Sequence, residues 1–162
     1  FHRIPALWLL HRMHHADLDY DLTTGLRFHP LELVISFALK SACVVALGAP
    51  AWAALAFEIA LNGLALFNHA NASLPTWLEP FARALVVTPD MHRVHHSVVP
   101  AETHSNFGFN LSIWDRLFYT YRAAPAAGPE KMTIGLPQFR GERELRLDRM
   151  LTQPFRNADE NE

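Results

Sequence analysis

The chain has 162 residues, 50% of them hydrophobic, and a formal net charge of −2 at pH 7. This length favours one domain with a buried core, and the near-neutral charge argues against nucleic acid as a partner. The single cysteine, Cys43, excludes a disulfide framework and a thiolate metal site. No charged segment leads into a short apolar core at the start, so a signal peptide is not expected.

The first predicted helix carries a group of histidines. Pro5 suits the opening turn, where its missing N–H costs nothing. A His-x-x-His-His motif follows at residues 11–15, and its three imidazoles share one face of a helix. Neutral imidazole is the commonest protein ligand for transition metals. We therefore expect His11, His14 and His15 to bind metal.

A polar loop and a further histidine come next. Residues 16–24, with three aspartates and two threonines, predict the loop. His29 directly precedes Pro30. Two interpretations of His29 stay open, because it can orient this loop as well as bind metal.

Two apolar runs, residues 31–47 and 51–67, are joined by Gly48-Ala49-Pro50, a natural break. Each has about 17 residues, the short end of what spans a bilayer, and a buried hairpin of a soluble protein is the alternative. All Lys and Arg except Lys40 lie outside both runs, and the turn has none. This distribution favours a membrane hairpin with both of its ends in the cytosol.

Lys40 and Glu58 lie inside the two runs at nearly equal distances from the turn. An antiparallel hairpin brings them to a similar depth. Because an unpaired charge within a membrane is costly, we expect the two side chains to face each other or protein.

The hairpin returns the chain to the side it left, so His69 is expected near the first histidine motif and is a candidate ligand. Asn68 directly precedes it. Residues 77–87, apolar with Arg83, predict a helix lying at the membrane interface.

The second His-x-x-His-His motif, at residues 92–96, has a clear helix start before it. Residues 88–90, Thr-Pro-Asp, supply an N-cap, a first-turn proline and an acidic group at the positive end of the helix dipole. A helix N-terminus disfavours protonated imidazole, which keeps ligands neutral. His92, His95 and His96 are therefore candidate ligands.

After this motif, residues 104–110 predict a glycine-containing loop and residues 113–121 an aromatic-rich helix. Asn106 or Asp115 can accept a hydrogen bond from a ligand imidazole. The alternative is a helix cap with an Asp115–Arg116 surface pair, and both stay open.

The sequence thus predicts an all-α fold with a histidine-bearing domain at residues 1–122, including the membrane hairpin at 31–67. Residues 123–162 are expected to form a linker rich in Ala, Pro and Gly, a charged amphipathic helix at 141–151 and a frayed acidic tail at 157–162.

The ordered set of motifs resembles the fatty acid hydroxylase/sterol desaturase superfamily over residues 1 to about 122. The motifs are Leu7-Trp8, the motif at 11–15, the hairpin, Asn68-His69, the motif at 92–96, Ser105-Asn106-Phe107-Gly108 and Trp114-Asp115-Arg116-Leu117-Phe118. Members are integral membrane oxygenases with a histidine-bound di-iron centre that faces the cytosol. They act on lipids or sterols with O2 and supplied electrons.

The resemblance implies a ligand set for two Fe ions. His2, six residues before Trp8, matches the second histidine of the family's first motif. The implied ligands are His2, His11, His14, His15, His69, His92, His95 and His96, with Asn68, Asn106 and Asp115 as hydrogen-bonding residues behind them. The first histidine of that first motif would lie before Phe1, so we expect a fragment that lacks one ligand and a leading hairpin. Tyr119 stands where the family more often has glycine.

The implied activity is hydroxylation or desaturation of a lipid or sterol, with electrons from an external donor such as a cytochrome or ferredoxin. Zinc can occupy such a site in the isolated protein. A zinc hydrolase is the second interpretation, but Arg12 and Arg93 hold the position of the glutamate in a His-Glu-x-x-His motif. A non-catalytic membrane protein that binds metal is the third.

Overall fold

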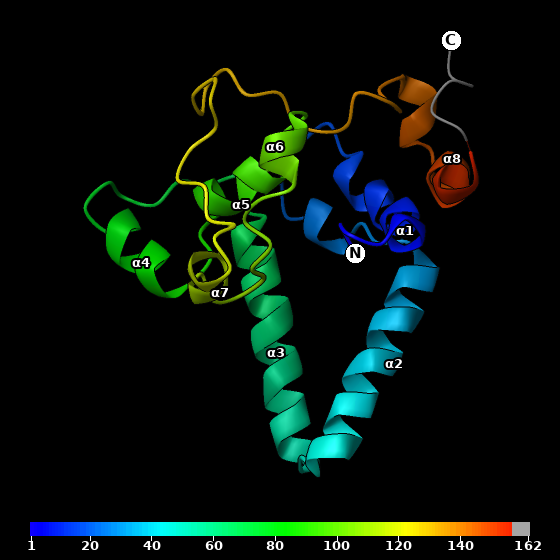
Figure 1. The fold of residues 1–162 in the computed structure, drawn as a ribbon. Coiled ribbons are helices and arrows are strands. Elements are labelled where there is room, and N and C mark those ends of the chain that lie inside the picture. Colours follow the sequence, from blue (N-terminus) through cyan, green and yellow to red (C-terminus); the bar gives the residue numbers. More distant parts are fainter. Residues whose placement is uncertain (157–162) are drawn as a thin grey trace.

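The computed structural model describes residues 1–156, and over this range it is all-α, as predicted (Figure 1). Its α-helices are α1 (Pro5–His15), α2 (Pro30–Leu47), α3 (Ala51–Asn68), α4 (Glu79–Leu85), α5 (Pro89–His95), α6 (Pro100–Thr103), α7 (Ile113–Leu117) and α8 (Leu147–Thr152). Short 3-10 turns are η1 (Thr24–Leu26), η2 (Glu142–Leu145) and η3 (Gln153–Phe155). The predicted tail at 157–162 lies outside the described residues.

The two long helices, α2 and α3, form the predicted hairpin. Gly48 ends α2 in the left-handed conformation, with φ of 61°, and Pro50 is the N-cap of α3. Glycine adopts this conformation without the steric cost that a Cβ imposes. The helices meet at the turn and diverge towards the remaining helices, which gather at the open end (Figure 1).

Both hairpin helices have the length and composition of membrane spans. Each has 18 residues, which corresponds to about 27 Å of helix. Their mean hydropathies are 1.8 and 1.4, yet only 6% and 11% of their residues are buried in the described structure. The core helix of a soluble protein would be mostly enclosed. The low burial therefore favours the membrane hairpin over the soluble alternative.

The predicted pairing of Lys40 with Glu58 is confirmed. The Lys40 ammonium lies 2.6 Å from a Glu58 carboxylate oxygen. The amide of Asn62, one turn further along α3, lies 3.3 Å from the second oxygen of the same carboxylate. The pair joins the two helices of the hairpin near their middle. Each charge thereby has a counter-charge, so neither is isolated among apolar side chains.

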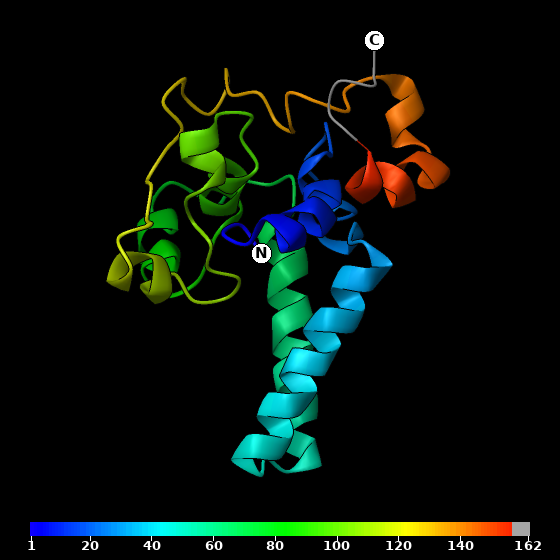
Figure 2. The ribbon, with the colours of Figure 1, turned by 45° about the vertical axis from the view of Figure 1, so that its right-hand side comes forward.

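The two helices with the histidine motifs are attached to different arms of the hairpin. α1 packs against α2, whereas α5 packs against the end of α3. Pro5 opens α1, and the Thr88 hydroxyl caps α5 by accepting a hydrogen bond from Met91 N, at 3.4 Å. Both helix starts agree with the sequence prediction. The helices other than α2 and α3 gather at the open end of the hairpin and are here called the cap. Figure 2 shows the cap above the hairpin from a second direction.

Three predicted helices are shorter than expected. The helix expected at 113–121 ends at Leu117, because Tyr119 adopts a left-handed backbone with φ of 58°. Glycine would adopt this conformation without the steric cost that the Tyr119 side chain imposes. The helix expected at 141–151 is broken at Arg146, whose extended backbone separates η2 from α8. The interfacial helix expected at 77–87 forms only at α4. Its side chains Phe81 and Leu85 are exposed.

The C-terminal segment packs on α1. The guanidinium of Arg12 donates to the backbone oxygens of Gln153 and Arg156 and lies over the ring of Phe139, at 5.0 Å. These contacts hold η3 against the first histidine motif. The domain boundary at residue 122 stays a prediction.

We expect the variant Lys40→Met to lose on the order of 2–3 kcal/mol of stability in a bilayer, because Glu58 then lacks its counter-charge. Glu58→Met should behave alike, whereas the double variant should recover much of the loss. A thermal-unfolding double-mutant cycle in lipid nanodiscs measures this coupling. Strictly additive losses would show that the pair contributes nothing.

Candidate metal centre

Eight histidines from four segments meet at the open end of the hairpin, so the predicted convergence is confirmed. They are His2 of the N-terminal segment, His11, His14 and His15 of α1, His69 at the C-cap of α3, and His92, His95 and His96 of α5 and its C-cap. All are buried except His2, which is half-buried. They form two groups of four, here called site A and site B.

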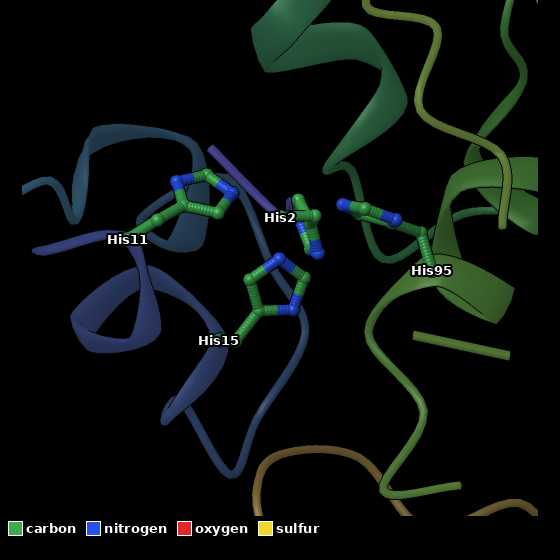
Figure 3. A group of neighbouring side chains, drawn as sticks. All are labelled: His2, His11, His15 and His95. Carbon is green, nitrogen blue, oxygen red and sulfur yellow. The ribbon is translucent and has the colours of Figure 1, made fainter. Parts of the chain in front are cut away.

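Site A consists of His2, His11, His15 and His95, with one nitrogen of each ring within 4.8 Å of the others. The rings of His2 and His15 each lie 4.6 Å from the ring of His95, between centroids. In Figure 3, His11 and His15 extend from α1 and His95 extends from α5 on the opposite side, with His2 between them. Site A therefore depends on α1 and α5 lying side by side.

Site B consists of His14, His69, His92 and His96, again with one nitrogen of each within 4.8 Å of the others. The Nε2 atom of His69 lies 3.3 Å from that of His14 and 3.2 Å from that of His92. Three ring nitrogens thus converge on one point from three helices. Such an arrangement suits a cation that accepts several lone pairs.

The two motifs divide their histidines between the sites in opposite ways. In α1, the i and i+4 residues His11 and His15 belong to site A, and His14 belongs to site B. In α5, the i and i+4 residues belong to site B, and His95 belongs to site A. The sites are consequently neighbours, with the stacked rings of His15 and His96 4.5 Å apart between centroids.

Hydrogen bonds on the outer ring nitrogen orient several of these histidines. The Nδ1 atoms of His14 and His95 donate to the backbone oxygens of Thr24, at 3.0 Å, and Ser105, at 2.7 Å. His69 Nδ1 is 2.6 Å from the oxygen of Ala65. Because a carbonyl oxygen only accepts, Nδ1 carries the proton and Nε2 presents a lone pair to the site.

His11 has a carboxylate in the same role. Its Nδ1 atom lies 2.7 Å from Glu32 Oε1, and both side chains are buried. Sequence reasoning does not single out Glu32, although an acidic residue in the first turn of an apolar helix is a usable signal. A carboxylate behind a ligand imidazole fixes the ring and increases its basicity.

Several buried ring nitrogens of the site histidines lack a hydrogen-bond partner within the described residues. The atoms are, whether they face a site or lie on the outer side of a ring, His2 Nε2, both ring nitrogens of His15, His92 Nδ1 and both ring nitrogens of His96. Buried polar atoms in native proteins nearly always have a partner. A metal ion in each site would supply a partner for one nitrogen of each ring, so the donor set fits two cations of the type that imidazole prefers.

Burial keeps these rings in the neutral form that binds metal. It lowers the pKa of His69 to about 4 and that of His95 to about 3. Burial, with repulsion from neighbouring imidazoles, also lowers the pKa of five further site histidines well below 6.5: His2, His14, His15, His92 and His96. Unprotonated rings leave their lone pairs available at neutral pH.

The asparagines and aspartate expected behind the ligands bind backbone instead. Asp115 is 1% exposed and accepts from the amides of Phe107 and Gly108, at 2.7 and 2.8 Å, rather than from an imidazole or Arg116. Asn106 donates to Met91 O, and Asn68 donates to Phe109 O. These residues fix the loop that follows α6 and its position against α3 and α5, so their effect on the histidines is indirect.

Two histidines lie outside the sites. His29 caps α2 by accepting from Leu31 N, at 3.2 Å, and its other nitrogen lies 3.1 Å from Leu151 O, so it orients the loop. His104, which sequence reasoning does not single out, is exposed, and its Nδ1 atom is 3.3 Å from that of His2.

Comparison with known proteins agrees with this geometry. A model of the fatty acid hydroxylase family matches residues 1–120. The ornithine lipid hydroxylase of Rhizobium tropici is 33% identical over 136 residues, which cover 83% of this chain and 39% of that protein. The alkylglycerol monooxygenases of Xenopus tropicalis and Homo sapiens are 32% and 31% identical, each over 83% of this chain and 28% of their own length. No solved structure matches significantly.

The chain thus spans less than two fifths of the length of these curated relatives. The family match nevertheless includes all eight site histidines and the whole hairpin. This chain belongs to the fatty acid hydroxylase family.

Proposed function

We propose that this chain carries the catalytic metal centre of an O2-dependent membrane oxidoreductase that hydroxylates or desaturates a lipid or sterol. The observation that carries the proposal is the pair of adjacent four-histidine sites at the open end of an apolar hairpin. The curated relatives, named as a lipid hydroxylase and as monooxygenases, support the same reaction class.

The histidines of site A and site B are proposed to hold two iron ions, one in each site. When bound, iron supplies the redox chemistry with O2 that cleavage of an unactivated C–H bond requires. Conversion of a C–H bond and O2 into an alcohol and water needs two electrons and two protons, so an external electron donor is part of the proposal. A single zinc ion per site can replace iron in the isolated protein.

The protein's own residues position the ligands and limit access of water. Glu32 and the backbone oxygens of Thr24 and Ser105 hold the imidazoles that face the metal positions. Phe28 stacks on His14 at 4.4 Å and Phe107 lies 5.7 Å from His95, between ring centroids. These aromatic walls favour a dry site, which protects reactive species from side reactions.

An apolar substrate suits the surroundings of this centre. The exposed apolar side chains of α2 and α3 place the sites at the end of a surface that contacts lipid. We further propose that the sites face the cytosol, because the hairpin turn has no basic residue. Labelling of a cysteine introduced at Ala49 by an impermeant maleimide, applied from the non-cytosolic side, tests this orientation.

A zinc hydrolase fits the geometry less well. Both four-residue groups consist of histidines alone. The Glu32 carboxylate binds Nδ1 of His11, so it is not free to act as a base at the metal. Arg12 points to backbone oxygens of the C-terminal segment, and Arg93 contacts Asn71 and the ring of Tyr20. A hydrolytic zinc site generally needs a carboxylate base beside the metal.

Loss of one ligand from either site should reduce the metal content of the purified protein. We expect His15→Ala in site A and His69→Ala in site B each to lose about one of two metal ions per chain. His29→Ala is the matched control, because it removes a histidine outside both sites. Elemental analysis by mass spectrometry measures the ratio, and an unchanged ratio in both site variants would refute the two-site assignment.

Glu32→Gln should weaken metal binding by about 10–100-fold without abolishing it, because the amide no longer fixes His11 as a carboxylate does. Glu58→Gln, on the same hairpin but paired with Lys40, should leave the affinity of the folded protein unchanged. Competition with a chromogenic chelator gives both affinities. Equal affinities in the two variants would argue against the role of Glu32.

Activity of the protein in lipid nanodiscs should require iron, O2 and a reductant together. We expect the full-length protein that contains this chain, iron-loaded and reduced, to consume O2 and to yield a hydroxylated or desaturated lipid, whereas its zinc-loaded form should do neither. An oxygen electrode measures the O2 consumption, and mass spectrometry of the lipids detects the modified product. Iron-loaded protein that consumes no O2 and leaves all lipids unchanged would support a non-catalytic metal-binding role instead.

A further inference from the structure

A polar pocket of about 450 Å³ lies beside site A and has no role in the metal geometry. It is lined by the N-terminal segment, by the end of α6 and by residues 119–122. Its charged lining residues are Arg3 and Arg122, with His104 beside them, and none of its lining residues is acidic. The pocket is therefore a concentration of positive charge without a counter-charge.

The two guanidinium groups have no hydrogen bond or ion pair among the described residues. The backbone of Arg122 is nevertheless fixed, because its N–H donates to Asn106 Oδ1 at 2.8 Å and its oxygen accepts from Asn106 Nδ2 at 2.9 Å. By contrast, Arg27 and Arg83 bind Asp17 and Glu79. An anionic ligand would supply the counter-charge that the lining of this pocket lacks.

The rim of the pocket includes a strained residue. Tyr119 is 95% exposed and has a left-handed backbone, held by the hydrogen bond from Thr120 N to Asp115 O at 2.8 Å. Such strain in a non-glycine residue costs energy, and it is common at ligand-binding positions. The Tyr119 phenol is a further hydrogen-bond donor at the pocket, besides the two arginines.

The pocket borders the metal centre at the contact between the imidazoles of His104 and His2. His104 lines the pocket, and its Nδ1 atom lies 3.3 Å from Nδ1 of His2 in site A. The ring of Trp8 lies 5.7 Å from that of His104 and closes the same corner. A group bound in the pocket is thus separated from His2 of site A by the side chain of His104 alone.

We propose that this pocket binds an oxyanion, a phosphate or carboxylate group, between Arg3 and Arg122. The planar guanidinium matches both groups by paired N–H···O hydrogen bonds. The volume suits a polar head group rather than a bare ion. The assignment of the oxyanion to the head group of the lipid substrate rests on the proposed function, whereas binding of the oxyanion itself does not.

The test is isothermal titration calorimetry of the whole protein in dodecyl maltoside, which has no phosphate. The probes are inorganic phosphate, dihexanoyl phosphatidic acid and dihexanoylglycerol. We expect both phosphate-bearing probes to bind and dihexanoylglycerol not to bind. Arg3→Ala and Arg122→Ala should each weaken binding about tenfold, and the lysine variants at the same positions should recover part of it.

Arg143→Ala is the matched control, because it removes an exposed arginine outside the pocket and should leave binding unchanged. Tighter binding of phosphatidic acid than of phosphate identifies a lipid head group, and equal binding identifies a free anion; both support the oxyanion site. The proposal is overturned if dihexanoylglycerol binds as tightly as phosphatidic acid, or if the two pocket variants behave like the control. Metal content and O2 consumption of the same variants test the proposed function separately.

Discussion

The structure depends on the burial of a cluster of imidazole rings whose hydrogen bonds are incomplete. Seven of the eight site histidines are buried, and several inner nitrogens lack a hydrogen bond among the described residues. Without a cation, each such nitrogen costs the folded state the free energy of a buried unsatisfied group. Metal binding would therefore couple directly to the stability of the cap, because it satisfies these groups in the folded state alone.

The hairpin turns this local requirement into an architecture. α2 and α3 diverge from the turn, and each supports one of the two histidine helices at its open end. Site A joins α1 to α5, and site B also includes His69 at the end of α3. The metal sites thus link segments that the hairpin holds apart, and the exposed surface of the hairpin has the apolar composition of a membrane span. The basic pocket at Arg3 and Arg122 adds a polar position next to site A.

Most of this arrangement is predictable from local patterns. Helical spacing places three histidines of each motif on one face, and the return of the hairpin brings His69 to them. Glu32 and His104 are missed, because their partners His11 and His2 are distant in sequence and no spacing rule connects them. Backbone partners such as Ser105 O are beyond sequence reasoning, since every residue has a carbonyl group. For the same reason Asp115 is misread, as its partners are backbone amides.

The central claim is that eight imidazoles hold two metal ions side by side. X-ray absorption at the iron edge of the iron-loaded protein tests it most directly. The geometry predicts a nitrogen-dominated coordination shell with the multiple scattering of several imidazoles per iron, no sulfur, and a second iron as a neighbour. A shell dominated by water and carboxylate oxygen, or a single isolated iron per chain, would contradict it.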